Sequence, residues 1–201
     1  MTMIRSVCVY CGSSPGTDPG FLGGARAFGK ILAERGVALV YGGGSNGLMG
    51  ELAKSVHDNG GKVIGVIPEF LRAREIAFTG AQELIVTDTM HTRKQIMFDR
   101  ADAFVALPGG IGTLEELVEQ LTWSQLGHHR KPIALANING FWEPLCELID
   151  HMKKLGFIRP DLSFDLSVAD RVEDILPLLQ AAATPKEKEE LEGFPKVIEK
   201  M

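Results

Sequence analysis

The chain has 201 residues, 45% of them hydrophobic, which is enough for one sizeable α/β domain with a real core. Its formal net charge of −5 argues against a general nucleic-acid binder, which would carry an excess of basic residues. The three cysteines argue against a disulfide framework. The sequence also lacks a signal-peptide pattern and an apolar run of membrane-spanning length. We therefore expect a cytoplasmic protein that binds neither membranes nor nucleic acid.

Short apolar runs alternate along the chain with segments of helical spacing. The runs predict strands at 6–10, 37–41, 62–67, 83–87, 103–107, 132–136 and 164–168. Caps and periodicity predict helices at 19–35, 48–59, from 88 or 89 to 100, from a cap at 113 to 126, at 141–155, and from a cap at 170 to 183. The segment 69–80 is ambiguous.

This alternation indicates the fold class. Strands that alternate with helices form a parallel sheet covered on both faces. We expect a three-layer α/β fold of Rossmann-like type, with a central parallel sheet of six to seven strands. Residues 1–183 would form a single nucleotide-processing domain, and the charged segment 184–201 a mobile tail.

A glycine-rich turn, Pro108-Gly109-Gly110-Ile111-Gly112, joins the fifth predicted strand to its helix. In open parallel sheets, ligands bind at the carboxyl ends of the strands, where this turn lies. Glycines let the backbone approach a ligand closely, and a helix N-terminus offers N–H groups and a positive dipole to an anion. The turn therefore predicts a phosphate site.

The helix after this turn carries Glu116. A capping box with Thr113 explains the spacing fully, because Thr113 would cap the helix and Glu116 would reach back to its N–H. A helical wheel places Glu116, Glu119 and Trp123 on the nominally exposed face. The tryptophan suggests that a ligand or another subunit covers this face, so Glu116 becomes a candidate acid, base or cation stabiliser.

Two adjacent cations, Arg93 and Lys94, lie in the first turn of a predicted helix, where they oppose the macrodipole. Asp88, Asp99 or solvent could neutralise them. Together they could instead form an anion site, since the arginine fork matches phosphate. We favour the anion site.

Other motifs give weaker signals. The pattern Gly42-x-Gly44-x-x-Gly47 matches the dinucleotide fingerprint, but it follows the second strand. It could be a packing turn, a redox-cofactor site or, as we favour, a close backbone approach to a nucleotide without a redox cofactor. The near P-loop at 24–30 lies inside a predicted helix, and the cysteine pair at 8 and 11 begins in a buried strand. We expect no metal and no cofactor.

Several stretches together resemble the LONELY GUY family. Residues 108–116 match its PGGxGTxxE motif, and residues 90–94 match its upstream Arg-Lys motif. Residues 11–14, 41–50 and 121–127 are similar as well, so that the resemblance extends to about residue 180.

The resemblance implies a cytokinin riboside 5'-monophosphate phosphoribohydrolase, which releases a free base and ribose 5-phosphate from a nucleoside 5'-monophosphate. It also implies a Rossmann-like homodimer with sites at the interface. Members were long labelled lysine decarboxylases, but no lysine here has a context that suggests a Schiff base. A non-catalytic nucleotide carrier or sensor of the same fold is the main alternative. A DNA-processing protein and a dehydrogenase are weaker ones.

The resemblance also implies roles for individual residues. Arg93 and Glu116 would be the catalytic pair, with Glu116 stabilising an oxocarbenium-like cation or activating water and Arg93 holding the phosphate or orienting Glu116. Both would also contact the substrate, together with Glu75, Lys94, Gly110, Ile111, Gly112, Thr113, Leu114, Glu115 and Thr122. Secondary candidates are Ser14, Gly43, Gly44 and Gly47.

Overall fold

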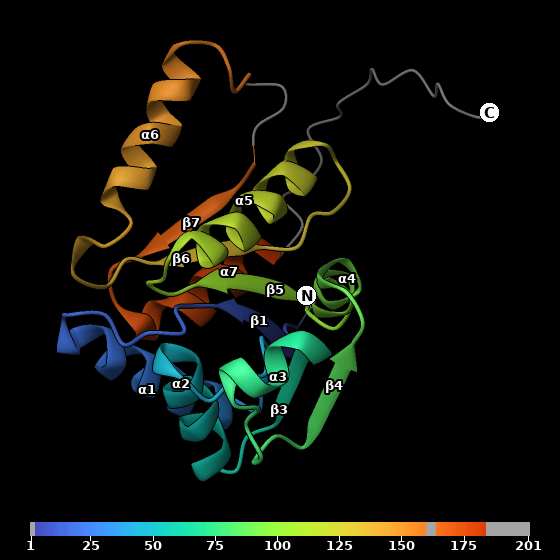
Figure 1. The fold of residues 1–201 in the computed structure, drawn as a ribbon. Helices are drawn as coiled ribbons and strands as arrows, with labels where there is room; N and C mark the ends of the chain where they lie inside the picture. Colours follow the sequence, from blue (N-terminus) through green and yellow to red (C-terminus); the bar gives the residue numbers. More distant parts are fainter. Residues whose placement is uncertain (1–2, 160–163, 184–201) are drawn as a thin grey trace, which may run out of the picture.

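The computed structural model describes residues 3–159 and 164–183, and within them seven strands form one parallel sheet. The strand order is β4-β3-β2-β1-β5-β6-β7. The strands are β1 (Ser6–Tyr10), β2 (Ala38–Tyr41), β3 (Val63–Pro68), β4 (Glu83–Thr87), β5 (Ala103–Ala106), β6 (Ile133–Ala136) and β7 (Leu166–Ala169). This confirms the α/β Rossmann-like fold (Figure 1).

Helices connect the strands. They are α1 (Pro19–Glu34), α2 (Gly47–Asp58), α3 (Glu69–Glu75), α4 (Met90–Asp99), α5 (Ile111–Gln125), α6 (Glu143–Lys154) and α7 (Ile175–Ala183). Most bounds lie within two residues of those expected, and the starts of α5 and α7 do not. None of these helices is long and apolar enough to cross a membrane. The predicted tail at 184–201 lies outside the described residues.

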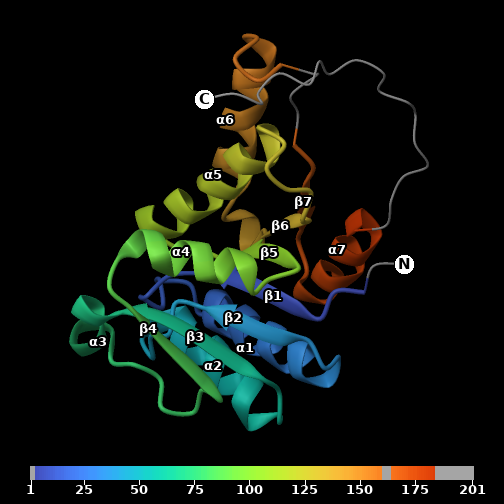
Figure 2. The same ribbon diagram turned by 90° about the vertical axis from the view of Figure 1, so that its right-hand side faces the viewer.

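Alternating side chains of the strands separate two layers of core. Val7 and Val9 of β1 pack with residues of α1, α2 and α7, whereas Cys8 and Tyr10 pack with residues of α4, α5 and α6. Figure 2 shows α4 and α5 over one face of the sheet and α1 and α2 beneath the other. Figure 1 shows α6 extending away from the sheet. Because all the strands run parallel, the turns that follow β1, β2 and β5 meet at one edge.

The start of α5 differs from the expected capping box. The cap is Gly110, which has no side chain to offer, and Thr113 lies buried inside the first turn. Glu116 does not reach back to Thr113, because its carboxylate pairs with Arg93. The prediction of a cap at Thr113 was therefore wrong.

The start of α7 differs as well. Asp170 does not cap it, since its Oδ1 accepts a hydrogen bond of 2.9 Å from Nδ2 of Asn137. The 3₁₀ turn η3 (Val172–Asp174) intervenes, and α7 begins only at Ile175. The carboxylate thus joins the ends of β6 and β7.

Trp123 of α5 is half-buried against side chains of the same chain. Its ring packs edge-on against Phe98 of α4, with 5.2 Å between centroids, and against His128, with 5.3 Å. Residues of α4 and of the turn after α5 therefore cover part of Trp123, and cover of the rest by a ligand or another subunit stays a prediction. This packing brings Arg93 and Lys94 of α4 alongside the acidic face of α5.

Candidate functional site

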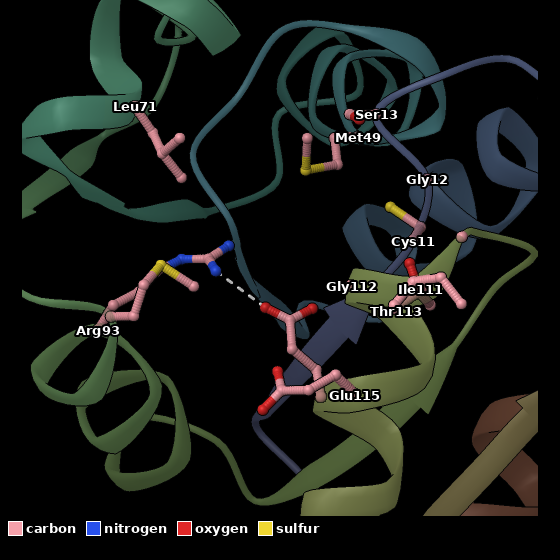
Figure 3. A pocket seen from close by; sticks show the side chains of 13 residues that line it. Cys11, Gly12, Ser13, Met49, Leu71, Arg93, Ile111, Gly112, Thr113 and Glu115 are labelled. Atoms are coloured by element: carbon pink, nitrogen blue, oxygen red, sulfur yellow. Dashed lines mark hydrogen bonds and ion pairs between the residues drawn. The ribbon is translucent and has the colours of Figure 1, made fainter.

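A cavity of about 350 Å³ lies at the carboxyl edge of the sheet. The turn after β1, the start of α5 and the start of α4 enclose it, and α2 and α3 each add one side chain (Figure 3). Its lining comprises Cys11, Gly12, Ser13, Met49, Leu71, Met90, Arg93, Gly110, Ile111, Gly112, Thr113, Glu115 and Glu116. The expected residues Arg93, Glu115, Glu116 and 110–113 thus share one cavity.

Arg93 and Glu116 form an ion pair in the wall of this cavity. Nη1 of Arg93 donates to Oε1 of Glu116 over 2.9 Å, and Nε donates to the carbonyl oxygen of Val66 over 3.1 Å. The side chains are only 10% and 12% exposed. The guanidinium is therefore fixed at two points, and it holds the carboxylate at the cavity.

The end of β2 makes room for this guanidinium. Strand β2 pairs with β3 only as far as Tyr41 and Gly65, so Val66 lies one residue beyond the paired region. Gly42 follows Tyr41, and a Cβ added at Gly42 would overlap Nη2 of Arg93. The absence of a side chain at Gly42 creates the notch in which Arg93 lies.

The surroundings of Glu116 act on its charge in opposite directions. Burial raises the pKa of Glu116 above its usual value, while the Arg93 guanidinium lowers it. The neighbouring Glu115 raises this pKa and Lys94 lowers it. A buried carboxyl group with a raised pKa, held beside a cation, suits general acid–base chemistry.

The N-terminus of α5 meets the same cavity. Gly110 caps the helix without any side-chain hydrogen bond, so the N–H groups of the first turn have no side-chain acceptor in the described structure. Residues 110–113 line the cavity beside Arg93. Such a helix start, with its dipole and free donors, is a site for an anion of phosphate type.

Other expected contacts lie elsewhere. Among the residues described, Lys94, Leu114 and Thr122 do not line the cavity. Nζ of Lys94 donates to Glu115 and Glu119, and the hydroxyl of Thr122 donates to the carbonyl oxygen of Val118 on its own helix. Glu75 ends α3, and its side chain lies outside what the structure describes.

The glycine-rich turn after β2 and the start of α2 make hydrogen bonds to neighbouring backbone groups. The N–H groups of Leu48 and Met49, at the start of α2, both donate to the carbonyl oxygen of Gly12. The N–H of Gly12 donates in turn to the carbonyl oxygen of Pro108 over 3.0 Å. Gly47 has a φ of +56° and lies against the backbone of the turn after β1. These contacts join three turns of the sheet edge through Gly12.

The secondary candidates follow from this arrangement. Gly43 accepts a hydrogen bond from the N–H of Phe78, and Gly44 pairs with Ala77 in an isolated bridge. Neither they nor Gly47 line the 350 Å³ cavity, as far as the described residues go. Ser14 lines a neighbouring cavity of about 270 Å³, which shares Gly12, Ser13 and Gly110 with the first.

Some lining residues were not among the expected site residues. Cys11, Gly12, Ser13 and Met49 lie in stretches that contributed to the family resemblance, and this signal could have found them. Met90 belongs to the stretch 90–94 that matches the Arg-Lys motif, so the same signal covers it, whereas Leu71 lies in the ambiguous segment 69–80. Leu71 reaches the cavity because α3 packs beside it, which no local pattern encodes. The described residues contain no group of three His, Cys, Asp or Glu side chains that could hold a metal ion.

The chain is similar in sequence to proteins of known family. A family model described as possible lysine decarboxylase matches residues 49–179. The chain is 51% identical over 157 residues to the cytokinin riboside 5'-monophosphate phosphoribohydrolase LOG of Oryza sativa subsp. japonica, covering 78% of this chain and 65% of that protein. It is 46% identical over 176 residues to the enzyme named LOG2 of Arabidopsis thaliana, covering 88% and 83%.

A solved structure is similar in fold. The molybdenum cofactor (Moco) carrier protein of Chlamydomonas reinhardtii superposes with a TM-score of 0.66 at 24% identity, covering 90% of this chain and 98% of that chain. At this identity the likeness concerns the fold alone.

Proposed function

Because the chain belongs to the family of cytokinin riboside 5'-monophosphate phosphoribohydrolases, we propose that it hydrolyses adenosine 5'-monophosphates, plain or modified at N6. Water adds to C1' of the ribose, the N-glycosidic bond breaks, and free base and ribose 5-phosphate leave. The observation that carries this proposal is the buried Arg93–Glu116 pair, which shares a cavity with the open N-terminus of α5.

The two parts of the cavity have complementary tasks in this reaction. The N–H groups at the start of α5 bind the 5'-phosphate, and this remote contact positions the ribose. Cleavage passes through an oxocarbenium-like state, which a nearby carboxylate stabilises. Glu116 provides that carboxylate or takes the proton of the attacking water, and Arg93 holds it in place.

The family model that matches is described as possible lysine decarboxylase, and this activity has less support. A decarboxylase that acts through a Schiff base needs an accessible lysine at its site. No lysine is among the residues that line the cavity in the described structure. A nucleotide carrier would need the same phosphate contacts, but it has no use for a buried carboxylate held against the sugar. We therefore place hydrolysis first.

The test is a panel of nucleoside 5'-monophosphates, with plain and N6-prenylated adenine, and product analysis for free base. We expect turnover of monophosphates and poor turnover of the matching nucleosides, because those lack the anchoring phosphate. Equal turnover of AMP and adenosine would contradict the phosphate assignment. Nucleotide binding without release of base would favour a carrier.

The Glu116→Gln variant tests the carboxylate. Gln keeps the shape but cannot carry charge, so we expect kcat to fall by about 10³-fold or more while nucleotide still binds. Binding is measured by titration calorimetry with AMP. The matched control is Glu34→Gln, at an exposed position on α1, which should keep full activity. A fully active Glu116→Gln enzyme would remove Glu116 from the mechanism.

We also propose that the protein works as a cytoplasmic homodimer with its sites at the interface. Several of the exposed large apolar side chains lie on or next to α5 and α6, and these include Val118, Leu126, Leu148, Leu155 and Phe157. A second copy would cover them. Cys8 and Cys146 form no disulfide in the described structure, which suits a reducing compartment. Light scattering that gives a monomer mass would contradict the dimer.

A further inference from the structure

Lys94 follows Arg93 on α4, but its ammonium lies among carboxylates outside the cavity. Nζ donates to Oε1 of Glu115 over 2.7 Å and to Oε1 of Glu119 over 2.8 Å. The side chain of Lys94 is 17% exposed, and that of Glu119 is 21% exposed. A cation held by two carboxylates has little capacity left for a substrate phosphate.

Glu119 has no role in the proposed chemistry, yet its side chain is largely buried and paired with Lys94. Its Oε2 is buried and has no hydrogen-bond partner in the described structure, which is costly unless the other contacts of the group compensate. The contact that the structure gives this carboxylate is Lys94. Glu115 and Glu119 lie one helical turn apart on α5, so Lys94 fits between them and ties α4 to α5.

Two cations of α4 therefore join it to α5 through three ion pairs. Arg93 pairs with Glu116 at the cavity, and Lys94 pairs with Glu115 and Glu119 beside it. Successive residues on α4 bind successive positions on α5, so a change in one pair displaces the other. We propose that Glu119 is a positioning residue, which holds Lys94 between α4 and α5 so that Lys94 orients and electrostatically balances the Arg93–Glu116 pair instead of binding substrate.

The charges around Glu116 support this role. Lys94 lowers the pKa of Glu116 and Glu115 raises it. Burial lowers the pKa of Lys94, but the hydrogen bonds and charges of Glu115 and Glu119 raise it, and on balance this pKa is raised. Three other titratable groups interact electrostatically with Glu116, and they are Arg93 on α4 and Cys8 and Tyr10 on β1.

The proposal rests on the proposed hydrolysis, but its main test does not need turnover. The pKa of Glu116 is measured by ¹³C NMR of the labelled carboxyl groups, with Glu116→Gln used for assignment. In Lys94→Met the pKa of Glu116 should rise, because a favourable cation is lost. In Glu119→Gln it should fall, because Lys94 is then less neutralised. Opposite shifts would show that both charges act on Glu116, and the kinetic readout tests whether Glu119 also holds the Arg93–Glu116 pair in place.

Kinetics give the second readout. We expect Glu119→Gln to lower kcat for AMP about tenfold through misplacement of the pair, with KM changed less than about threefold. The acid limb of its pH–rate profile should move to lower pH, and that of Lys94→Met to higher pH. The matched control is Glu83→Gln, which removes the 2.7 Å ion pair to Arg100 near the other end of α4 and should change neither value.

Two results would overturn the proposal. One is a Glu116 pKa that stays fixed, or moves in the same direction, in Lys94→Met and Glu119→Gln. The other is a KM for AMP that rises about tenfold or more in Lys94→Met at unchanged kcat, which would make Lys94 a phosphate ligand. A wild-type enzyme that releases no base from any nucleotide would refute the proposed hydrolysis instead, and the NMR titration would still decide the role of Glu119.

Discussion

Two glycine-rich turns lie at the same edge of the sheet, each between a buried strand and a helix, and they differ in what their helix starts bind. The first N–H groups of α2 donate to the carbonyl oxygen of Gly12. The start of α5, capped only by Gly110, meets the cavity. Glycine content is similar in the two turns, so composition alone does not identify a ligand site. The acceptor of the helix N–H groups distinguishes a packing turn from an anion site.

Gly42→Ala tests whether the turn after β2 sets the position of Arg93. The added methyl would overlap Nη2 of Arg93, a flexible side-chain end, so the fold can accommodate it while the guanidinium moves. We expect kcat for AMP to fall about a hundredfold, because a shift of about 1 Å in a catalytic group can lower the rate by this factor. The measurements are steady-state kinetics and thermal unfolding. An unchanged kcat would mean that the notch does not set the position of Arg93.

Gly112→Ala tests the second turn directly. Gly112 lies in the first turn of α5, lines the cavity and has open space around it. We expect KM for AMP to rise about tenfold, because the methyl crowds the phosphate donors. The free energy of unfolding should rise by about 0.5–1 kcal/mol, as for glycine replaced by alanine in a helix.

The control for this variant is Gly23→Ala. Gly23 is exposed inside α1 and also has no neighbour where the methyl would lie. It should gain similar stability in a denaturant titration without any change in KM. If Gly112→Ala leaves KM unchanged as well, the start of α5 does not bind the phosphate.

Gly47→Ala is expected to affect stability and not the kinetic constants. Gly47 has a φ of +56°, and an added methyl would overlap the backbone of Ser13 and Ser14. We expect the free energy of unfolding to fall by about 1–3 kcal/mol. KM for AMP, measured on the folded fraction, should stay within about twofold of wild type. A large rise in KM would give the first turn a direct role in binding.

Local patterns were sufficient for most of the fold. Apolar runs bounded by turn residues predicted the ends of β1 and β4 correctly. The run of β1 is continuous because this central strand is buried on both faces, whereas β4 is an edge strand with alternating exposure. The starts of α5 and α7 were missed for one reason. Thr113 and Asp170 are good caps locally, but packing buries Thr113 and a hydrogen bond from Asn137 engages Asp170. Tertiary partners took precedence over local preference.

The site was predictable where chemistry and motif coincided. Arg93 and Glu116 were expected as a pair, and they lie 2.9 Å apart although 23 positions separate them in sequence. The partners of Lys94 were not expected, since Asp88 and Asp99 were the acids considered. Glu115 and Glu119 replace them because α4 and α5 pack side by side. Such contacts depend on how helices pair across the sheet, which periodicity in a single sequence does not reveal.

The backbone of Gly12 links three turns at the carboxyl edge of the sheet. Its N–H holds the turn after β5, and its carbonyl oxygen holds the start of α2. The three turns therefore have a common junction made of main chain alone, and loosening one of them releases hydrogen bonds of the others. The site should open and close as one cooperative unit, while the side chains around it can change without breaking that junction.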